Sequence, residues 1–330
     1  MKIYLDFWLP KEALAFLRAG LRGHELLFSG KPSGTVLGSG TLDAGFAEAD
    51  IALGQPDPQG VALSERLRWI HVSSSGITRY DTPAFRALVQ EKGILVTNSA
   101  HVYNEACADH VFSFMLAQSR RLPEGLATPA FASGDAWLRH RDGCVPLRGQ
   151  SVLIVGYGAI GERLVDLLAP YGMSIAGYRR RVRGDEPVRM VDDTGLMDAL
   201  GEADHVVNIL PDSPSTRGFF DGTRLGLMKA GAVFYNIGRG RTVDQDALLA
   251  RFSLDPGFYA WLDVTDPEPL PEGHPLRSES RCRITPHVAG GHRGESMTLI
   301  RHFLRNLRRF ERGELLEDCV MPLQNGRIPG

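Results

Sequence analysis

The chain has 330 residues, 43% of them hydrophobic and 23% charged, and its formal net charge is −2. This length suits two domains, and the composition is typical of a folded protein rather than a disordered one. A net charge near zero creates no global field that would attract nucleic acid or an anionic membrane, so we expect neither as a partner.

Membrane insertion and secretion are not indicated either. No apolar run approaches the eighteen or more residues that a spanning helix needs, and Asp6 and Pro10 interrupt any signal-peptide core. The four cysteines are far apart and form no CxxC pair, so we expect reduced thiols and a cytoplasmic location. Neither an HExxH motif nor an EF-hand loop occurs, so the sequence requires no metal.

The first hundred residues alternate strand-like apolar runs with helical segments, the pattern of parallel βαβ units. Helical spacing is expected over 11–19 and 83–91, and the stretch 29–40, rich in Gly, Ser and Pro, is expected to be a loop. The predicted strands of this part are 2–5, 25–28, 51–53, 69–72 and 94–96.

A long helix is predicted over 101–121, after which the stretch 122–148 shows no clean period. Helical spacing returns over 293–312, so we expect the chain to return to the first domain and the second domain to be an insertion. The predicted strands of the second domain are 151–155, 174–178, 205–209, 233–236, 259–263 and 283–285.

A glycine motif, GYGAIG at 156–161, directly follows the predicted strand 151–155 and begins a predicted helix. The G-x-G-x-x-G pattern alone is a weak indicator of dinucleotide binding, but this position between a strand and a helix makes it a good one. Gly156 permits a tight turn, Gly158 lets the backbone approach a pyrophosphate, and Gly161 lets the helix pack closely. Free amides at Ala159 and Ile160, at the positive end of the helix, would hold the phosphates. The alternative is a glycine-rich turn without a ligand.

Arginines occupy the place where an NAD site normally has an acid, at the end of the next strand. Arg179, Arg180 and Arg181 follow the predicted strand 174–178. A carboxylate there would repel the 2′-phosphate of NADP, whereas a guanidinium binds phosphate in bidentate fashion. The sequence therefore favours NADP over NAD, with Arg179 the first choice for this contact and Arg180 the second. A solvated basic loop, with NAD as cofactor, is the alternative.

Three later segments appear in a fixed order after the glycine motif: NIGRG at 236–240, LDVTDPEPL at 262–270 and ITPHVAGG at 284–291. Together they resemble the D-isomer-specific 2-hydroxyacid dehydrogenase family over nearly the whole chain. The EPLP stretch at 268–271 and the arginine-rich loop resemble the glyoxylate/hydroxypyruvate reductases within that family. Aspartate at 109, where a glutamate is usual, and threonine at 265, where phenylalanine is common, depart from the family pattern.

The resemblance implies a catalytic set that suits the reduction of a 2-oxo acid. Such a reduction needs a cation for the carboxylate, a proton donor for the developing alkoxide and a positioned hydride. Arg239 is implied to hold the substrate, His287 to be the acid/base, and Glu268 to hydrogen-bond the imidazole. The backbone amides of Ser75 and Gly76 are implied to bind the substrate carboxylate.

The resemblance also implies the fold and the remaining site residues. We expect an α/β protein of two doubly wound parallel-sheet domains, with a Rossmann dinucleotide-binding domain (101–291) inserted in a flavodoxin-like substrate domain (1–100 and 292–330). A homodimer is implied, with 122–148 as a possible arm. Further predicted cofactor-binding residues are Leu210, Pro211, Thr216, Ile237, Gly238, Asp263 and Gly290.

Two other functions share this scaffold. Formate dehydrogenases have glutamine where this chain has Glu268, so that interpretation is disfavoured. A transcriptional corepressor that senses NAD(H) has the same motifs, and the sequence excludes it only weakly. The expected function is thus hydride transfer between NADP(H) or NAD(H) and a small D-2-hydroxy acid/2-oxo acid pair such as glycolate/glyoxylate or glycerate/hydroxypyruvate. The alternative is the corepressor-type sensor.

Overall fold

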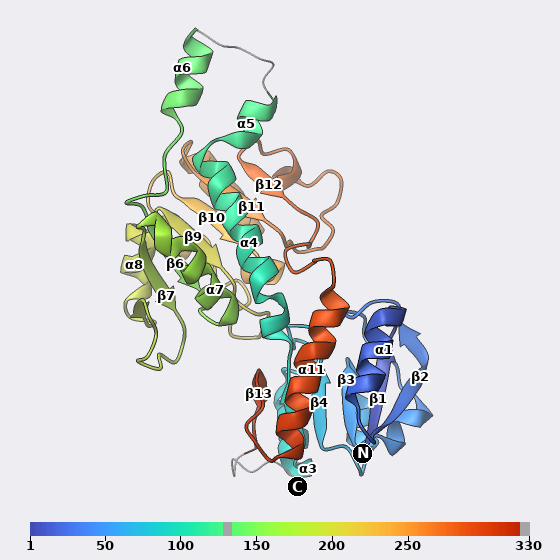
Figure 1. The fold of residues 1–330 in the computed structure, drawn as a ribbon. Helices are drawn as coiled ribbons and strands as arrows, with labels where there is room; N and C mark the ends of the chain where they lie inside the picture. Colours follow the sequence, from blue (N-terminus) through green and yellow to red (C-terminus); the bar gives the residue numbers. More distant parts are fainter. Residues whose placement is uncertain (128–133, 324–330) are drawn as a thin grey trace. The chain divides into compact units, whose positions relative to one another are not determined.

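The computed structural model describes residues 1–127 and 134–323. The chain forms two compact units: unit 1 contains Met1–Tyr103 and Gly291–Gly330, and unit 2 contains Asn104–Gly290. In Figure 1, the blue and red ends of the chain build unit 1, and the green-to-orange middle builds unit 2. Each unit is an α/β fold around a mostly parallel sheet, so the predicted fold class is confirmed. The assignment of the units to substrate and cofactor binding stays a prediction.

Unit 1 contains a six-stranded sheet in the order β13-β5-β4-β3-β1-β2. All its pairs are parallel except β13 with β5, and the order 2-1-3-4-5 is that of flavodoxin-like folds. The strands are β1 (Lys2–Phe7), β2 (Glu25–Ser33), β3 (Ile51–Gly54), β4 (Trp69–Val72), β5 (Leu95–Thr97) and β13 (Cys319–Met321).

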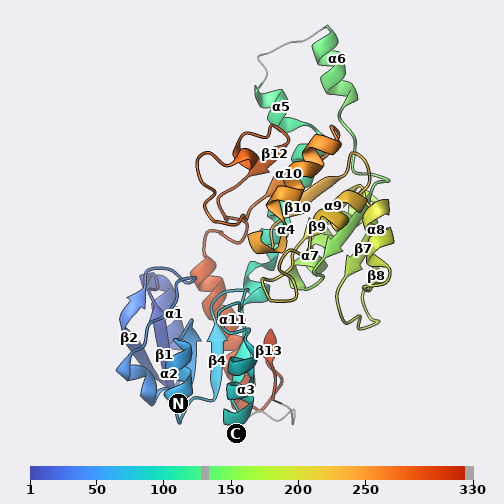
Figure 2. The same cartoon turned by 180° about the vertical axis from the view of Figure 1, so that it is seen from behind.

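Helices cover both faces of this sheet: α1 and α11 lie in front of it in Figure 1, and α2 and α3 in Figure 2. The α11 helix presents an apolar face on which Phe303 and Phe310 stack against Trp69, with ring centroids 5.2 and 5.4 Å away. The helices of unit 1 are α1 (Lys11–Gly20), α2 (Pro58–Leu63), α3 (Pro83–Lys92) and α11 (Glu295–Glu311), with the 3₁₀ turn η1 (Ala44–Glu48).

Unit 2 contains a seven-stranded, fully parallel sheet in the order β12-β11-β10-β9-β6-β7-β8. Counted from β6, this is the Rossmann order 3-2-1-4-5-6 with one further strand, and its switch point lies between β6 and β9. The strands are β6 (Ser151–Val155), β7 (Ser174–Tyr178), β8 (Arg189–Val191), β9 (His205–Asn208), β10 (Val233–Asn236), β11 (Tyr259–Leu262) and β12 (Cys282–Ile284).

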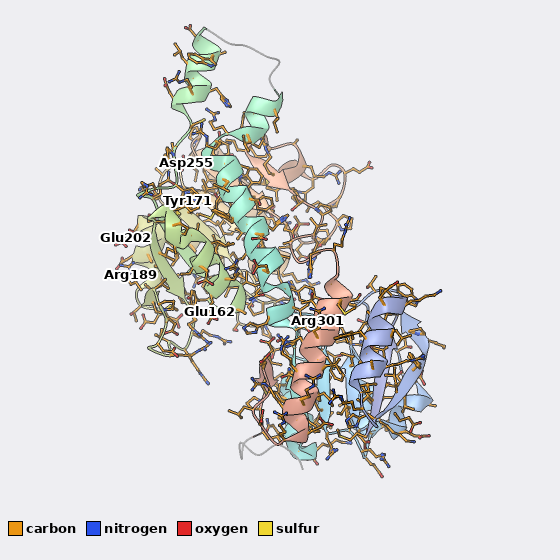
Figure 3. The ribbon with its side chains drawn as sticks, viewed as in Figure 1. Glu162, Tyr171, Arg189, Glu202, Asp255 and Arg301 are labelled. Carbon is orange, nitrogen blue, oxygen red and sulfur yellow. The ribbon has the colours of Figure 1, made fainter. Side chains whose placement is uncertain are left out.

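This sheet is also covered on both faces, by α4 and α7 in front in Figure 1 and by α9 and α10 in front in Figure 2. At the outer strand β8, Arg189 pairs with Glu202 of α8 (Nη2–Oε2 3.1 Å; Figure 3). The helices are α4 (Ala100–Ser119, which begins in unit 1), α5 (Leu122–Ala127), α6 (Asp135–Asp142), α7 (Ala159–Leu168), α8 (Leu196–Glu202), α9 (Gly222–Leu227) and α10 (Gln245–Leu254). Short 3₁₀ turns are η2 (Ala169–Tyr171), η3 (Gly240–Thr242) and η4 (Pro275–Arg277).

The structure corrects the sequence-based expectations in two regions. The predicted loop 29–40 begins as strand, because β2 continues to Ser33 and pairs there with Phe7 after a register shift. Backbone pairing to β1 overrides the weak strand propensity of these Gly and Ser residues. The aperiodic stretch 122–148 contains α5 and α6, neither of which buries a residue, so no apolar period marked them. None of the helices in the described ranges has the length and hydropathy that a bilayer crossing requires.

Unit 1 buries an unusual carboxyl group near the carboxyl ends of its parallel strands. Asp6 of β1 is 2% exposed, and its Oδ2 accepts a hydrogen bond from the Gln55 amide (3.0 Å). Burial raises the pKa of Asp6 to about 7, although the Gln55 amide and the charge of Arg79 act in the opposite direction. A charged Asp6 therefore destabilises the folded state relative to a neutral one.

Asp6→Asn is expected to stabilise the protein at pH 8. The folded-state pKa of about 7 lies above the ordinary value of 3.8, so the cost of the charge is absent below about pH 4 and grows until the pH passes 7. The shift corresponds to at most about 4 kcal/mol in the free energy of unfolding. Urea unfolding of parent and variant at several pH values between 4 and 8 tests this. A stability difference that does not grow with pH would contradict it.

Candidate active site

The glycine motif forms a turn with an open backbone at its centre. Gly156 takes φ +97°, and a Cβ there would lie 2.8 Å from the carbonyl carbon of Ile209. A Cβ on Gly158, by contrast, would meet nothing closer than 4.0 Å, so space for a ligand remains beside this residue. A Cβ on Gly161 would lie 3.2 Å from Ile154, which fits its predicted role in helix packing.

The first turn of α7 supplies free amides next to that space. Its first intrahelical hydrogen bond runs from the Glu162 amide to the Gly158 carbonyl (2.8 Å). The amides of Ala159 and Ile160 precede that bond and are not used within the helix. Free amides, an open glycine and the positive helix end together fit the pyrophosphate of a dinucleotide.

The arginines after β7 point to different partners. The Nη1 of Arg179 lies 3.4 Å from Oε1 of Glu186, within the same loop. The Nη1 of Arg180 donates to Oγ of Ser215 (3.3 Å), in the segment that follows β9. Arg180 is exposed, whereas Arg179 is half-buried. Of the two predicted phosphate ligands, Arg179 is thus close to a carboxylate, whereas Arg180 contacts a neutral hydroxyl.

The segment after β9 is held by a threonine. Thr216 donates from Oγ1 to the Pro211 carbonyl (2.6 Å) and accepts from the Ser213 amide (2.9 Å). Leu210 and Thr216 are buried, whereas Pro211 is exposed. The Thr216 hydroxyl therefore shapes the segment, and Pro211 is the residue of this set that has a free surface.

A network of buried side-chain amides positions the segment after β10 that carries Arg239. The sequence motifs did not indicate this network. Asn208 and Asn236 end the adjacent strands β9 and β10 and pair in register. Nδ2 of Asn208 donates to Oδ1 of Asn236 (3.0 Å) and to Oγ1 of Thr242 (2.7 Å), while Thr242 donates to the Arg239 carbonyl (2.6 Å). Oδ1 of Asn236 also accepts the Gly238 amide (3.1 Å). The available signal was an asparagine at or next to the carboxyl end of two neighbouring predicted strands, 205–209 and 233–236.

Arg239 follows β10 at the carboxyl edge of the sheet and is half-buried. Its Nη1 donates to the Gly238 carbonyl (2.6 Å). Burial lowers the pKa of Arg239, while the charges of Glu268 and Asp212 act in the opposite direction. An arginine remains cationic under these conditions, so the site has a positive charge in a place of reduced hydration. The predicted neighbours Ile237 and Gly238 are buried beside it.

The arginine segment and the acidic segment after β11 touch through backbone. A Cβ on Gly240 would overlap both the carbonyl carbon and the carbonyl oxygen of Thr265. Thr265, at the position where phenylalanine is common, is buried and donates to the Pro267 carbonyl (2.9 Å). Glycine at 240 is therefore what lets the segment that carries Arg239 approach the one that leads to Glu268.

Gly240→Ala is expected to lower kcat/KM by about a hundredfold, because the added methyl group would force the two segments apart and displace catalytic groups. Steady-state kinetics with a 2-oxo acid test this. Gly226→Ala is a matched control, since a Cβ at Gly226 would meet nothing within 4 Å. Equal kinetics in both variants would contradict the assignment.

Asp263, predicted to lie near the nicotinamide, uses its carboxylate to hold the histidine segment. Its side chain is 1% exposed. Oδ1 accepts the Thr285 hydroxyl (2.6 Å) and the Val288 amide (2.9 Å), and Oδ2 accepts the Ala289 amide (2.9 Å). His110 of α4 lies beside the same carboxylate, with Nε2 3.5 Å from Oδ1 of Asp263 and 3.2 Å from Oγ1 of Thr285. This carboxylate thus places residues on both sides of His287, while Gly290 ends the segment.

His287 and Glu268 form a close pair. Nδ1 of His287 lies 2.6 Å from Oε1 of Glu268, with both side chains about 40% exposed (42% and 39%). His287 takes φ +52°, a conformation rare for residues other than glycine. The pair lines a cavity of about 650 Å³ whose remaining wall includes Leu270, Leu276 and Ile284. Because Nδ1 is occupied, Nε2 is the nitrogen that can exchange a proton with a ligand.

The predicted carboxylate binders of unit 1 follow β4. The Ser75 carbonyl accepts from Nδ2 of Asn98 (2.5 Å), and the Gly76 carbonyl accepts from Oγ of Ser74 (2.6 Å). The amides of Ser75 and Gly76 make no hydrogen bond to another group within residues 1–127 and 134–323. Ser75 and Gly76 belong to unit 1, whereas Arg239, Glu268 and His287 belong to unit 2.

Comparison with known proteins identifies the family. Residues 112–289, more than half of the chain, match the D-isomer specific 2-hydroxyacid dehydrogenase, NAD binding domain. The chain is 32% identical to a glyoxylate reductase of Aeropyrum pernix, over 79% of this chain and 78% of that protein. It is 31% identical to glyoxylate/hydroxypyruvate reductase B of Salmonella newport, over 85% and 87%. The chain therefore belongs to the D-isomer specific 2-hydroxyacid dehydrogenase family, and is a nicotinamide-dependent oxidoreductase.

A solved structure agrees with this membership. The crystal structure of the TT0316 protein from Thermus thermophilus superposes with a TM-score of 0.72 at 29% sequence identity, and the alignment covers 97% of this chain and 100% of that one. The predicted family, fold class and enzyme class are thereby confirmed.

Proposed function

We propose that this enzyme reduces small 2-oxo acids such as glyoxylate and hydroxypyruvate with NADPH. The observation that carries the proposal is the His287–Glu268 pair at 2.6 Å in the wall of a cavity of about 650 Å³. The names of the relatives, a glyoxylate reductase and a glyoxylate/hydroxypyruvate reductase, support the substrate class.

Each group of the proposed site has a chemical task. The glycine motif would hold the pyrophosphate of the reduced nicotinamide cofactor, which would supply the hydride. The Arg239 guanidinium binds the substrate carboxylate and polarises the ketone. In unit 1, the Ser75 and Gly76 amides are donors that suit a carboxylate. Nε2 of His287 donates its proton to the ketone oxygen, which becomes the hydroxyl of the product. Glu268 accepts the Nδ1 hydrogen bond and keeps the ring oriented for that transfer.

A panel of 2-oxo acids tests the substrate class. Glyoxylate, hydroxypyruvate, pyruvate and phenylpyruvate are each supplied with NADPH, and cofactor oxidation is followed. Glyoxylate and hydroxypyruvate, the acids in the names of the relatives, should give the highest kcat/KM. A preference for phenylpyruvate would overturn the substrate class. Tight cofactor binding with no turnover of any acid would instead favour the sensor function.

NADPH should be preferred over NADH, through Arg180 together with Arg179. Loss of one arginine–phosphate hydrogen-bonded pair corresponds to about a ten- to hundredfold loss of affinity. Arg180→Ser should therefore lower kcat/KM for NADPH by about that factor and change the value for NADH much less. Arg181→Ser, the exposed neighbour, is the control. A parent enzyme that favours NADH would overturn the NADPH preference.

We also propose that the enzyme is a homodimer. Exposed apolar side chains lie on and beside α5 and α6 of unit 2, and Leu126 alone is 86% exposed. The strand β12 is an edge of the sheet, and open strand edges and apolar patches are features that proteins usually cover. Light scattering on a sizing column should give twice the mass of one chain, and Leu126→Glu should shift the protein toward the monomer.

A further inference from the structure

The loop between β7 and β8 contains an acid that the proposed mechanism does not use. Residues 179–188 carry four arginines, at 179, 180, 181 and 183, and two acids, Asp185 and Glu186. Although the loop is largely exposed, the Glu186 side chain is only 4% exposed. Asp185 is exposed and takes part in no ion pair within the part of the chain that the structure describes.

The Glu186 carboxylate lies in a small anion site made by its own loop. Oε1 accepts the Arg183 amide (2.8 Å), and Oε2 accepts the Gly184 amide (2.8 Å). Gly184 takes φ +91°, and successive amides in such a turn form a concave anion-binding nest. The Arg179 guanidinium completes the site at 3.4 Å. These are the same kinds of donor that bind a phosphate group.

The loop is further tied to the glycine motif. Nη2 of Arg183 lies 3.8 Å from Oε1 of Glu162, which stands in the first turn of α7 (Figure 3). The Arg183 amide, more than any other group, lowers the pKa of Glu186, so this carboxylate is charged at neutral pH. Arg183 is directed toward α7, Arg179 is paired with an internal anion, and Arg180 is directed toward Ser215.

We propose that Glu186 determines cofactor specificity. It is an internal counter-anion that pairs with Arg179 and thereby limits the affinity of the enzyme for the 2′-phosphate of NADPH. The inference rests on the proposed cofactor site at the end of β7. A charge on Glu186 both neutralises Arg179 and repels a phosphate placed near the arginines. Its removal should therefore increase NADPH affinity, and NADH, which lacks the 2′-phosphate, should gain less.

The test measures cofactor binding without turnover. Kd values for NADPH and NADH are obtained by fluorescence titration of the parent, Glu186→Gln and Asp185→Asn. Glutamine keeps the size of the side chain and an oxygen for the nest but removes the charge. The ratio Kd(NADH)/Kd(NADPH) should rise about three- to tenfold in Glu186→Gln, as expected for one charge about a side chain's length away near a protein surface. Asp185→Asn removes the same charge one residue away and should change the ratio less than twofold.

A ratio in Glu186→Gln that equals the one in Asp185→Asn, or that falls below the parent's, would overturn the proposal. Whether Glu186 acts through Arg179 is tested by making Glu186→Gln in an Arg179→Ser background. The increase in the ratio Kd(NADH)/Kd(NADPH) should be smaller there, because no guanidinium is released from its ion pair. An equal increase in both backgrounds would overturn this role of Arg179. The parent's own ratio decides the NADPH preference separately, and the panel of 2-oxo acids decides the proposed reaction.

Discussion

His287→Ala is expected to lower kcat for 2-oxo acid reduction by about two to four orders of magnitude, the range for loss of a general acid–base. Nε2 is the free nitrogen of a ring whose Nδ1 is 2.6 Å from Glu268, so no other group of the pair can donate the proton. The Kd for NADPH should stay close to the parent value, because the sites proposed for the pyrophosphate and the ribose phosphate are the glycine motif and the loop 179–188, neither of which contains His287. Single-turnover kinetics and fluorescence titration measure the two quantities.

Glu268→Gln is the matched variant for this prediction. The amide oxygen of glutamine can still accept the Nδ1 hydrogen bond, so orientation of the ring is retained in part and the loss in kcat should be smaller than in His287→Ala. Unchanged turnover in His287→Ala with any accepted 2-oxo acid would remove this residue from the mechanism, whatever the glutamine variant does.

The second large effect is expected at Arg239. Arg239→Ala should raise KM and lower kcat together, because in the proposed mechanism the cation acts on the bound carboxylate and on the oxygen that gains charge in the transition state. Loss of such a group corresponds to about a hundred- to thousandfold loss in kcat. The reduced hydration of the half-buried guanidinium strengthens both interactions.

Arg239→Lys distinguishes geometry from charge. A lysine keeps the charge but lacks the planar fork that binds a carboxylate in bidentate fashion, so it should restore only part of the activity. Steady-state constants for parent, Ala and Lys variants check this. A lysine variant that matches the parent in both kcat and KM would show that a point charge is enough.

The fold could be predicted wherever burial leaves a pattern. Strands such as β9 (His205–Asn208) are buried along their whole length, and α11 buries one regular face, so both were readable from apolar residues. The three-residue strands β8 and β13 were not predicted, because they are short and bury at most one residue each, whereas the equally short β5 is buried throughout. The helix α6 is formed by a segment with no buried residue, so its sequence gives no amphipathic signal.

The candidate site could be assembled from the sequence where a residue's own chemistry suggests a role, and not where a residue would act through others. The glycine motif and the segments with Arg239, Glu268 and His287 are local sequence motifs, so they can be identified without a structure. The roles of Asn208, Thr242 and Gly240 depend on contacts between residues far apart in the chain, which no local pattern contains. Glu186 was missed for a related reason, since an acid in a basic loop looks solvated until its burial is seen.

The insertion of one unit within the other sets an order of events during synthesis. Unit 2 is contiguous, so all of Asn104–Gly290 can leave the ribosome and fold while the chain is still growing. Unit 1 begins first but waits for α11 and β13, because Trp69 has no stacking partners until Phe303 and Phe310 are made. A released chain truncated near residue 290 would therefore contain all of unit 2 but only part of unit 1, whose uncovered sheet is where chaperones should bind.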